Sequence, residues 1–324
     1  MRRVLITGAN GFVGGVLVDE LAKRCYPVRL AVRRVEGSSR LDPPAEETGD
    51  WAPIGDIGPD TNWSDALKDV NCVIHLAGRV HVMKDIARDP LTEFRRINTA
   101  GTEHLARCAA QAGIKRLVFM SSIKVNGEET KTTPFAETDP ARPHDPYGIS
   151  KWEAEQALAR VAADTGLEVV VLRSPLIYGP EVKGNFLSLV KAIVRGVPLP
   201  LAGINNRRSL LYVGNAVDAL VLAATHPSAA GKTFLLSDGQ DVATPDLIQR
   251  LAKLLCVPAR LVRCPPFLLQ LAGGMLGKAE SVSRLTNSLQ VDSSTIRNVL
   301  GWRPPWSLEQ GLQATAEWYR NELR

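Results

Sequence analysis

Cysteine is scarce in this chain of 324 residues, and its five copies follow no metal-binding spacing. They stand at Cys25, Cys72, Cys108, Cys256 and Cys264, so the sequence predicts no metal site. An odd number of cysteines also argues against the disulfide framework of a small secreted domain. We therefore expect free thiols in a reducing cytoplasm.

Long apolar runs and clustered charge are missing too. No apolar stretch has the length that a bilayer crossing needs, and Met1-Arg-Arg leads directly into an apolar strand, so we expect no signal peptide. The most apolar segment, 266–276, is interpreted as a packed helix, which leaves peripheral membrane attachment open. The net charge of +5 comes from scattered basic residues and predicts no nucleic-acid surface.

The beginning of the chain carries the most informative motif. Val4–Ile6 is a short apolar strand, and Gly8, Gly11 and Gly14 follow it before an amphipathic helix. Gly8 allows a sharp turn, Gly11 leaves room for a pyrophosphate, and Gly14 lets the helix pack close to the sheet. The helix N-terminus offers unpaired N–H groups to an anion. We therefore predict a dinucleotide site at this turn, with further contacts from Asn10, Phe12 and Val13.

Strand and helix patterns alternate along the chain. Strands are predicted at 28–32, 70–77, 116–120 and 168–172, and helices at 12–22, 90–112, 147–163 and 215–224. This order predicts an α/β fold with a Rossmann-type, doubly wound parallel sheet covered by helices on both faces. Its site is expected at the carboxyl ends of the strands.

The end of the second strand bears on the choice of cofactor. A carboxylate at this place binds the free ribose 2′-hydroxyl of NAD, but here Arg33 and Arg34 follow Val32. Arginine pairs with a 2′-phosphate through charge-assisted hydrogen bonds, so the sequence favours NADP(H) over NAD(H). Two solvated surface arginines are the alternative. Asp56 and Ile57, which follow another short strand, are predicted beside the adenine.

Tyr147 and Lys151 stand four residues apart in a predicted helix and therefore share one face. A free tyrosine, with a pKa near ~10, is a poor base at neutral pH. A neighbouring ammonium and an oxidised nicotinamide favour the phenolate, so Tyr147 can exchange a proton with a sugar hydroxyl or carbonyl. Lys151 can also hold the cofactor ribose. The spacing alone is common by chance, and it gains weight from the glycine turn and from Ser121-Ser122 at a strand end.

In these features the chain resembles the extended short-chain dehydrogenase/reductase superfamily, in its branch of NAD(P)-dependent nucleotide-sugar epimerases, dehydratases and 4-ketoreductases. The resemblance covers nearly the whole length and is far more specific for the superfamily than for the reaction. Its motifs are Thr7-Gly8-x-x-Gly11-x-x-Gly14, His75-Leu-Ala-Gly78, Asn98-Thr-Ala-Gly-Thr102, Ser121-Ser122, Tyr147-x-x-x-Lys151, Leu172-Arg-Ser-Pro175, Tyr178-Gly-Pro180 and Leu300-Gly-Trp-Arg-Pro304.

The resemblance implies a role for each matching position. Ser122 would hydrogen-bond the reacting oxygen, with Tyr147 as the acid/base group and Lys151 as its partner. Asn98 would lie near the active site, where its role can also be structural. Implied cofactor contacts are Leu76, Ala77, Gly78 and Pro175. Implied substrate contacts are Arg79, Ser122, Lys124, Asn185 and Arg208, with Arg284 as a weaker candidate that can equally be a solvated arginine.

Departures from the family pattern narrow the reaction. The 4,6-dehydratases carry an Asp-Glu pair after the serine or threonine, but Ile123 and Lys124 stand here, so dehydration is disfavoured. The arginines after Val32 favour NADPH, and we therefore expect reduction of a UDP-linked 4-keto-(6-deoxy)hexose, with Tyr147 as proton donor. The close alternative is a 4-epimerase of UDP-glucose or UDP-N-acetylglucosamine. Reduction of an aryl ketone and a non-catalytic NADP(H) sensor are further options.

The resemblance also implies two lobes and a dimer. Residues 1–178 with 206–240 are expected to form the NAD(P)-binding domain, and 179–205 with 241–324 the smaller α/β lobe for the nucleotide-linked sugar. Family members often form homodimers through the helix near Asn98 and the helix that carries Tyr147. A stripe of Ala154, Ala157, Leu158 and Val161 permits this, but packing of the helix on the sheet explains the stripe equally well.

Overall fold

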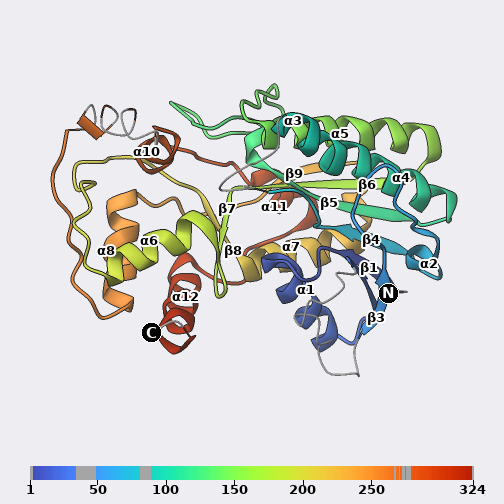
Figure 1. Cartoon of the computed structure of the whole chain (residues 1–324), viewed down its shortest axis with the longest axis horizontal. Helices are drawn as coiled ribbons and strands as arrows, with labels where there is room; N and C mark the ends of the chain where they lie inside the picture. Colours follow the sequence, from blue (N-terminus) through green and yellow to red (C-terminus); the bar gives the residue numbers. More distant parts are fainter. Residues whose placement is uncertain are drawn as a thin grey trace.

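A parallel β-sheet forms the centre of the larger lobe (Figure 1). The computed structural model describes residues 3–33, 49–80, 89–265, 268–269, 271, 274 and 279–322. In these residues the sheet has seven strands in the order β3-β2-β1-β4-β5-β6-β9. Their bounds are β1 Val4–Thr7, β2 Val28–Val32, β3 Gly49–Pro53, β4 Cys72–His75, β5 Arg116–Ser122, β6 Glu168–Ser174 and β9 Thr233–Leu235. This order confirms the predicted Rossmann-type fold.

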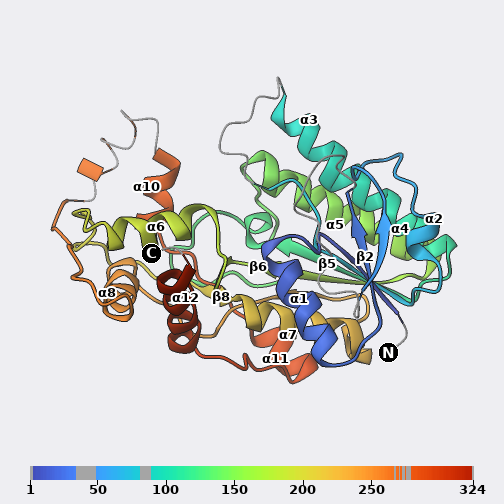
Figure 2. The same cartoon turned by 60° about the horizontal axis from the view of Figure 1, so that its bottom comes forward.

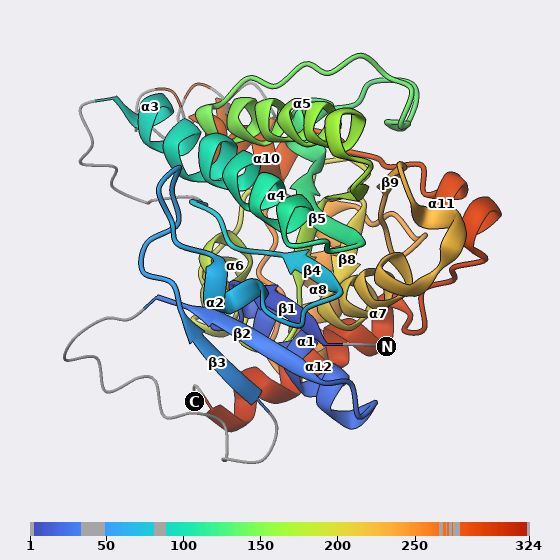
Figure 3. The same cartoon turned by 90° about the vertical axis from the view of Figure 1, so that its right-hand side faces the viewer.

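Helices cover both faces of the sheet (Figure 3). On one face α1 (Phe12–Lys23), α7 (Val213–Thr225) and α11 (Ser294–Leu300) bury one apolar core. On the other, α2 (Ser64–Leu67), α4 (Gly101–Gln111) and α5 (Pro146–Thr165) bury a second. The strands are apolar toward both layers, as a parallel sheet requires. The stripe on α5 is fully buried, and Ala154, Leu158 and Val161 pack in this second core, so helix-to-sheet packing accounts for them.

A second lobe lies at the end of the molecule away from β2 (Figures 1 and 2). It contains α6 (Gly184–Val194), α8 (Thr244–Leu254), α10 (Ala279–Thr286) and α12 (Leu308–Glu322). A small parallel pair, β7 (Leu176–Tyr178) and β8 (Leu210–Tyr212), joins it to the large sheet. Tyr178, Phe186 and Leu312 belong to its separate apolar core. The predicted lobe boundaries stay a prediction, and Ile296, Leu300 and Trp302 pack with the core of the larger lobe.

The helix predicted at 90–112 is divided. It consists of α3 (Pro90–Phe94), a π-helix (Arg95–Ala100) and α4. Such a turn holds one extra residue, which a period of 3.6 does not reveal in sequence, and π-turns often mark functional sites. Short 3₁₀ turns occur at Ile123–Val125 and Pro227–Ala229.

The structure bears on two expectations, which concern the state of the cysteines and the presence of a membrane-spanning helix. All five cysteines lie among the described residues, and each is a free thiol. In the described part of the chain, no helix has both the length and the apolar character that a bilayer crossing requires. The apolar segment 266–276 lies mostly outside the described residues.

Candidate active site

The glycine turn between β1 and α1 is shaped by contacts between backbone atoms. Gly8 has a φ of +76°, and a Cβ there would lie 2.8 Å from the backbone nitrogen of Ala77. A Cβ on Gly14 would lie only 2.1 Å from the carbonyl oxygen of Gly8. Side chains at these two positions would therefore separate α1 from the sheet or push away the segment after β4. Gly11 donates its N–H to the Gly8 carbonyl at 2.9 Å and closes the turn.

The first turn of α1 suits an anion. Gly11 is the N-cap and supplies no side-chain acceptor, and no acid stands in the first turn, so the N–H groups there are left for another partner. Asn10 is exposed in the turn, Val13 packs on the sheet, and Phe12 packs against the core of the second lobe. These residues fit a bound pyrophosphate of a dinucleotide at the junction of the two lobes.

The segment after β4 is fixed by a buried histidine, which the sequence analysis named only as part of a motif and gave no role. His75 is hydrogen-bonded to the hydroxyl of Thr7 (2.6 Å) and to that of Thr102 (2.9 Å). Thr7 also accepts the N–H of Ala77 (3.2 Å), and its carbonyl accepts that of Leu76. Burial, together with the charge of Lys151, lowers the pKa of His75 to about 3. The ring is thus neutral and structural, and it holds the implied cofactor contacts in place. Its nearest sequence signal is a histidine at the end of an apolar strand.

Asn98, on the π-helix, holds the next residues of the same segment. Its side chain accepts the backbone N–H of Arg79 (2.7 Å) and donates to the Arg79 carbonyl (3.0 Å) and to Ser150 Oγ (3.0 Å). A Cβ on Gly78 would lie 3.0 Å from Asn98 Oδ1 and 3.6 Å from Lys151 Nζ. Asn98 therefore ties the segment after β4 to the helix that bears Tyr147.

Ser122, Tyr147 and Lys151 come together where β5 ends. Ser122 is the last residue of β5, and a hydrogen bond joins its hydroxyl to that of Tyr147, near the start of α5. Lys151, one turn further along α5, is buried and donates to the Met120 carbonyl at 2.9 Å. Its Nζ lies 6.0 Å from the centre of the Tyr147 ring. The structure thus brings the three predicted catalytic side chains into one place.

The pKa values in this cluster differ from the sequence-based expectation. Burial raises the pKa of Tyr147 to about 12, and the hydrogen bond from Ser122 offsets only part of this effect. Burial also lowers the pKa of Lys151 to about 8, against the opposing charge of Glu155. Burial of both groups therefore opposes the acidification of Tyr147 that the sequence predicted from the neighbouring ammonium.

Two acidic residues organise the start of α5 and the loop after β5. Asp145 caps α5 by accepting the N–H of Gly148 at 2.7 Å, and it also pairs with the ammonium of Lys124. Lys124 donates to Glu128 as well, at 3.2 Å. The predicted substrate contact Lys124 is thus held beside the catalytic helix by two carboxylates.

A buried ion pair lies behind the catalytic residues and was missed in the sequence. The Arg173 guanidinium donates to both carboxylate oxygens of Glu155 (3.0 and 2.6 Å) and to Asn126 (2.9 Å). Ser121 donates to the same carboxylate at 2.5 Å. Glu155 and Arg173 are each about 5% exposed, so the pair is shielded from water. A charged residue at the end of the apolar strand Val169–Leu172 was the available signal, since such a charge needs a partner.

The predicted adenine side is more exposed. Arg33 pairs with Asp56 at 3.1 Å, and both side chains are about two-thirds exposed. Ile57 contacts Gly101 at the start of α4, where a Cβ would lie 2.8 Å from it. Arg34 lies outside the described residues. Pro175 is buried between β6 and β7.

The predicted substrate residues of the second lobe are dispersed over two elements and a loop. Asn185 is exposed at the start of α6. Arg208 precedes β8 and donates to the Asn287 carbonyl at 3.3 Å. Burial and the nearby charge of Arg284, on α10, lower the pKa of Arg208 to about 10. The two arginines therefore form one positive locus, although they stand 76 positions apart in the sequence (284 − 208).

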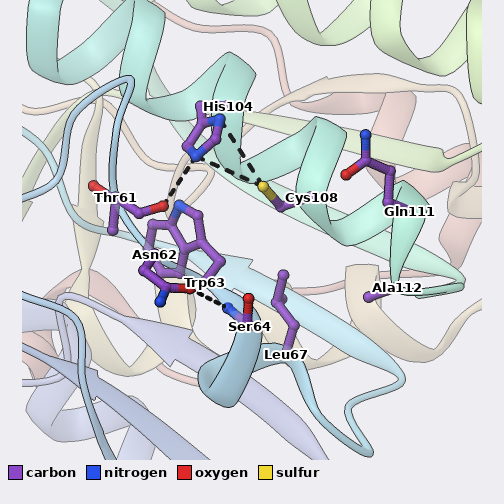
Figure 4. A pocket seen from close by; sticks show the side chains of 9 residues that line it. All are labelled: Thr61, Asn62, Trp63, Ser64, Leu67, His104, Cys108, Gln111 and Ala112. Atoms are coloured by element: carbon purple, nitrogen blue, oxygen red, sulfur yellow. Dashed lines mark hydrogen bonds between the residues drawn. The ribbon is translucent and has the colours of Figure 1, made fainter.

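A separate hollow of about 430 Å³ lies between α2 and α4 (Figure 4). It is lined by Trp63, His104, Cys108 and neighbouring polar residues, and His104 is hydrogen-bonded to the Thr61 carbonyl at 2.9 Å. None of its lining residues is a predicted site residue. We assign no role to it.

Comparison with known proteins places these features in a family. The profile of the "NAD dependent epimerase/dehydratase family" matches residues 4–236. A "UDP-glucose 4-epimerase" of Vibrio cholerae is 43% identical over 98% of this chain and 95% of its own length. A solved structure, "MoeE5 in complex with UDP-glucuronic acid and NAD", is 28% identical with a TM-score of 0.78, covering 99% of this chain and 100% of its own. A "UDP-Glucose 4-Epimerase" from Thermotoga maritima with UDP-glucose shares the fold at a TM-score of 0.79, with 24% identity over 99% of this chain and 100% of its own.

Proposed function

Because the chain belongs to the NAD dependent epimerase/dehydratase family, we propose that it is a UDP-hexose 4-epimerase that works with bound NAD. The observation that carries this proposal is the meeting of Ser122, Tyr147 and Lys151 at the end of β5, where Lys151 lies close to the segment after β4 that packs on the glycine turn. The name of the Vibrio cholerae relative supports epimerisation better than the 4-keto reduction that the sequence favoured. The MoeE5 structure contains UDP-glucuronic acid and NAD, which supports the proposal that this chain also binds a UDP-sugar and NAD.

NAD would supply the acceptor and the donor of the hydride. The side chains supply the proton chemistry. Tyr147 takes the proton of the C4 hydroxyl as the C4 hydride leaves, which gives a 4-keto sugar, and returns the proton to the same oxygen when hydride is added from the opposite face. Protons and electrons balance over the two halves, so no reductant is consumed. Ser122 holds the C4 oxygen, and Lys151 adds positive charge beside the phenol.

The positive locus of the second lobe would hold the substrate diphosphate. Arg208 and Arg284 offer forked donors, which suit phosphate oxygens. The negative charge of the diphosphate would also offset the repulsion between the two guanidinium groups. We extend the proposal to Asn185, at the start of α6, as a further contact on this side.

The test is conversion of UDP-glucose by the purified protein without added reductant. The products are separated by chromatography, and NAD(P)H absorbance is followed in the same sample. UDP-galactose formed without net change in NAD(P)H is the expected result. UDP-N-acetylglucosamine is offered in parallel, because it tests whether the site accepts a 2-acetamido group. Failure to epimerise either sugar, with NAD bound, would overturn the proposal.

One observation favours the NADPH-dependent reductase as a second candidate. β2 ends without an acid, and Arg33 stands beside the predicted adenine side, although it pairs with Asp56. Titration calorimetry with NADP(H) and NAD(H) decides between them. If Arg33 holds a 2′-phosphate, R33D weakens NADPH binding far more than NADH binding. Equal effects on both would remove this candidate.

We also retain the homodimer and the cytoplasmic location as proposals. The helix near Asn98 and α5 pack against each other and are joined by an Arg95–Glu153 pair at 2.6 Å. Light scattering after size-exclusion chromatography measures the mass directly, and a monomer at assay concentrations would exclude the dimer.

A further inference from the structure

Exposed apolar side chains gather on one end of the second lobe. Among the described residues, seven large apolar side chains are exposed, and four of them lie here. They are Val197 (44% exposed), Val262 (49%), Leu268 (43%) and Leu271 (60%). Single exposed apolar residues are ordinary, whereas a cluster of them marks an interaction surface.

These residues come from two segments that lie side by side. The N–H of Leu199 donates to the Arg260 carbonyl (2.8 Å), and Val262 donates to the Leu199 carbonyl (2.9 Å). Ala202 donates to the Val262 carbonyl at 3.1 Å. Leu269 packs into the core of the second lobe, so the second segment is anchored next to its exposed neighbours. The paired stretches 199–202 and 260–263 lie at the left-hand edge of the molecule in Figure 1, beyond α6 and α8, and Leu268 and Leu271 follow shortly after them in the chain.

The charge on this edge has one sign. The sequence contains no Asp or Glu from 182 to 217, nor from 247 to 279, and these stretches include both segments. Arg195, Arg260 and Arg263 are exposed within them. Apolar side chains flanked by basic ones suit the surface of a bilayer with anionic headgroups, where the apolar groups enter the acyl boundary and the cations stay at the phosphates.

We propose that this edge, formed by Val197, Val262, Leu268 and Leu271 with Arg195, Arg260 and Arg263, docks the enzyme on an anionic phospholipid membrane. A protein partner is disfavoured, because none of the four exposed large apolar residues described at this edge is aromatic, and the two segments carry basic residues without acidic ones. The proposal concerns a surface separate from the glycine turn and from Tyr147, so it does not depend on the reaction catalysed.

Vesicle co-sedimentation of the full chain tests it. Vesicles of phosphatidylcholine alone are compared with vesicles of equal parts phosphatidylcholine and phosphatidylglycerol, at low and high salt. The expected result is binding to the anionic vesicles that falls with salt. R260E/R263E should lower the partition coefficient by about tenfold or more. L268S/L271S should lower it several-fold, because apolar area no longer enters the bilayer.

Matched control variants show whether vesicle binding depends on this edge or only on the net positive charge of the protein. K68E/K115E makes the same change of charge on exposed lysines of the larger lobe, and V80S removes an apolar side chain as exposed as Leu271. Both controls should bind vesicles like the unmodified chain. No binding to anionic vesicles, or an equal loss in K68E/K115E and R260E/R263E, would overturn the proposal. So would a change of oligomeric state in L268S/L271S without a change in vesicle binding, because a second copy would then be the partner.

Discussion

The larger lobe and the second lobe build their halves of the candidate site in different ways. In the larger lobe, backbone contacts and hydrogen bonds fix the buried site residues, as at Gly14, Asn98 and Lys151, whereas the predicted adenine side and Asn10 are exposed. In the second lobe Arg208 and Arg284 are half-buried, and Asn185 is exposed. The chemistry thus rests on a rigid framework, whereas the part that would recognise the substrate has room to vary. This difference explains why the motifs specify the superfamily better than the substrate.

The largest expected effect concerns Tyr147, because it is the group that moves the proton. Y147F should lower kcat by about 10²–10⁴-fold with little change in substrate binding. Y26F, which alters a partly buried tyrosine packed against the core beneath the sheet, is the control and should keep full activity. Steady-state kinetics on UDP-glucose measures both. An active Y147F would remove the proposed mechanism, whatever the substrate.

Much of the larger lobe could be predicted because local pattern determines it. The strand at 28–32 and the glycine turn stand where apolar runs and glycines predicted them. The polar network could not be predicted, because the partners of His75 and Glu155 are distant in sequence and meet only when β4, α5 and β6 are assembled. The same holds for Arg208 and Arg284, since both residues were named but nothing local indicated that the charge of one acts on the other.

The second-largest effect is expected on the free energy of unfolding when the close backbone contact of α1 with the glycine turn is disturbed. G14A should destabilise the fold by about 1–3 kcal/mol and abolish dinucleotide binding, since its Cβ would meet the Gly8 carbonyl oxygen. G15A is the matched control: its nearest atom would be 3.9 Å away, and alanine should gain up to about 1 kcal/mol in the helix. Thermal melts with and without NAD measure both variants. Equal behaviour of the pair would refute the close approach of α1 to the sheet.

A smaller effect, on substrate binding, is expected when Arg208 of the second lobe is replaced. R208A should raise KM for the UDP-sugar by roughly 10–100-fold with kcat little changed, as expected for one lost charge-assisted pair. R207A, on the exposed neighbour, is the control. If R208A instead lowers kcat at unchanged KM, Arg208 does not hold the ground-state substrate and the contrast between the lobes fails.

The smallest effect is a shift of the pH profile. Glu155 raises the pKa of Lys151, which burial has lowered to about 8, so E155Q should lower it further. Lys151 then loses its charge at lower pH, and the alkaline limb of kcat should move to lower pH. E153Q removes a partly exposed carboxylate, paired with Arg95, from the same helix and should leave the limb in place. A uniform loss of activity in E155Q, without displacement of the limb, would assign the ion pair a structural role only.

The most direct test of the central claim follows the fate of the C4 hydrogen. UDP-glucose deuterated at C4 is incubated with the enzyme and unlabelled NAD, and the UDP-galactose formed is analysed by mass spectrometry and NMR. Retention of the deuterium at C4 is expected, because the hydride returns to the sugar it left while Tyr147 handles only the proton on oxygen. Replacement of the deuterium by hydrogen from solvent or from an added reduced cofactor would contradict the account.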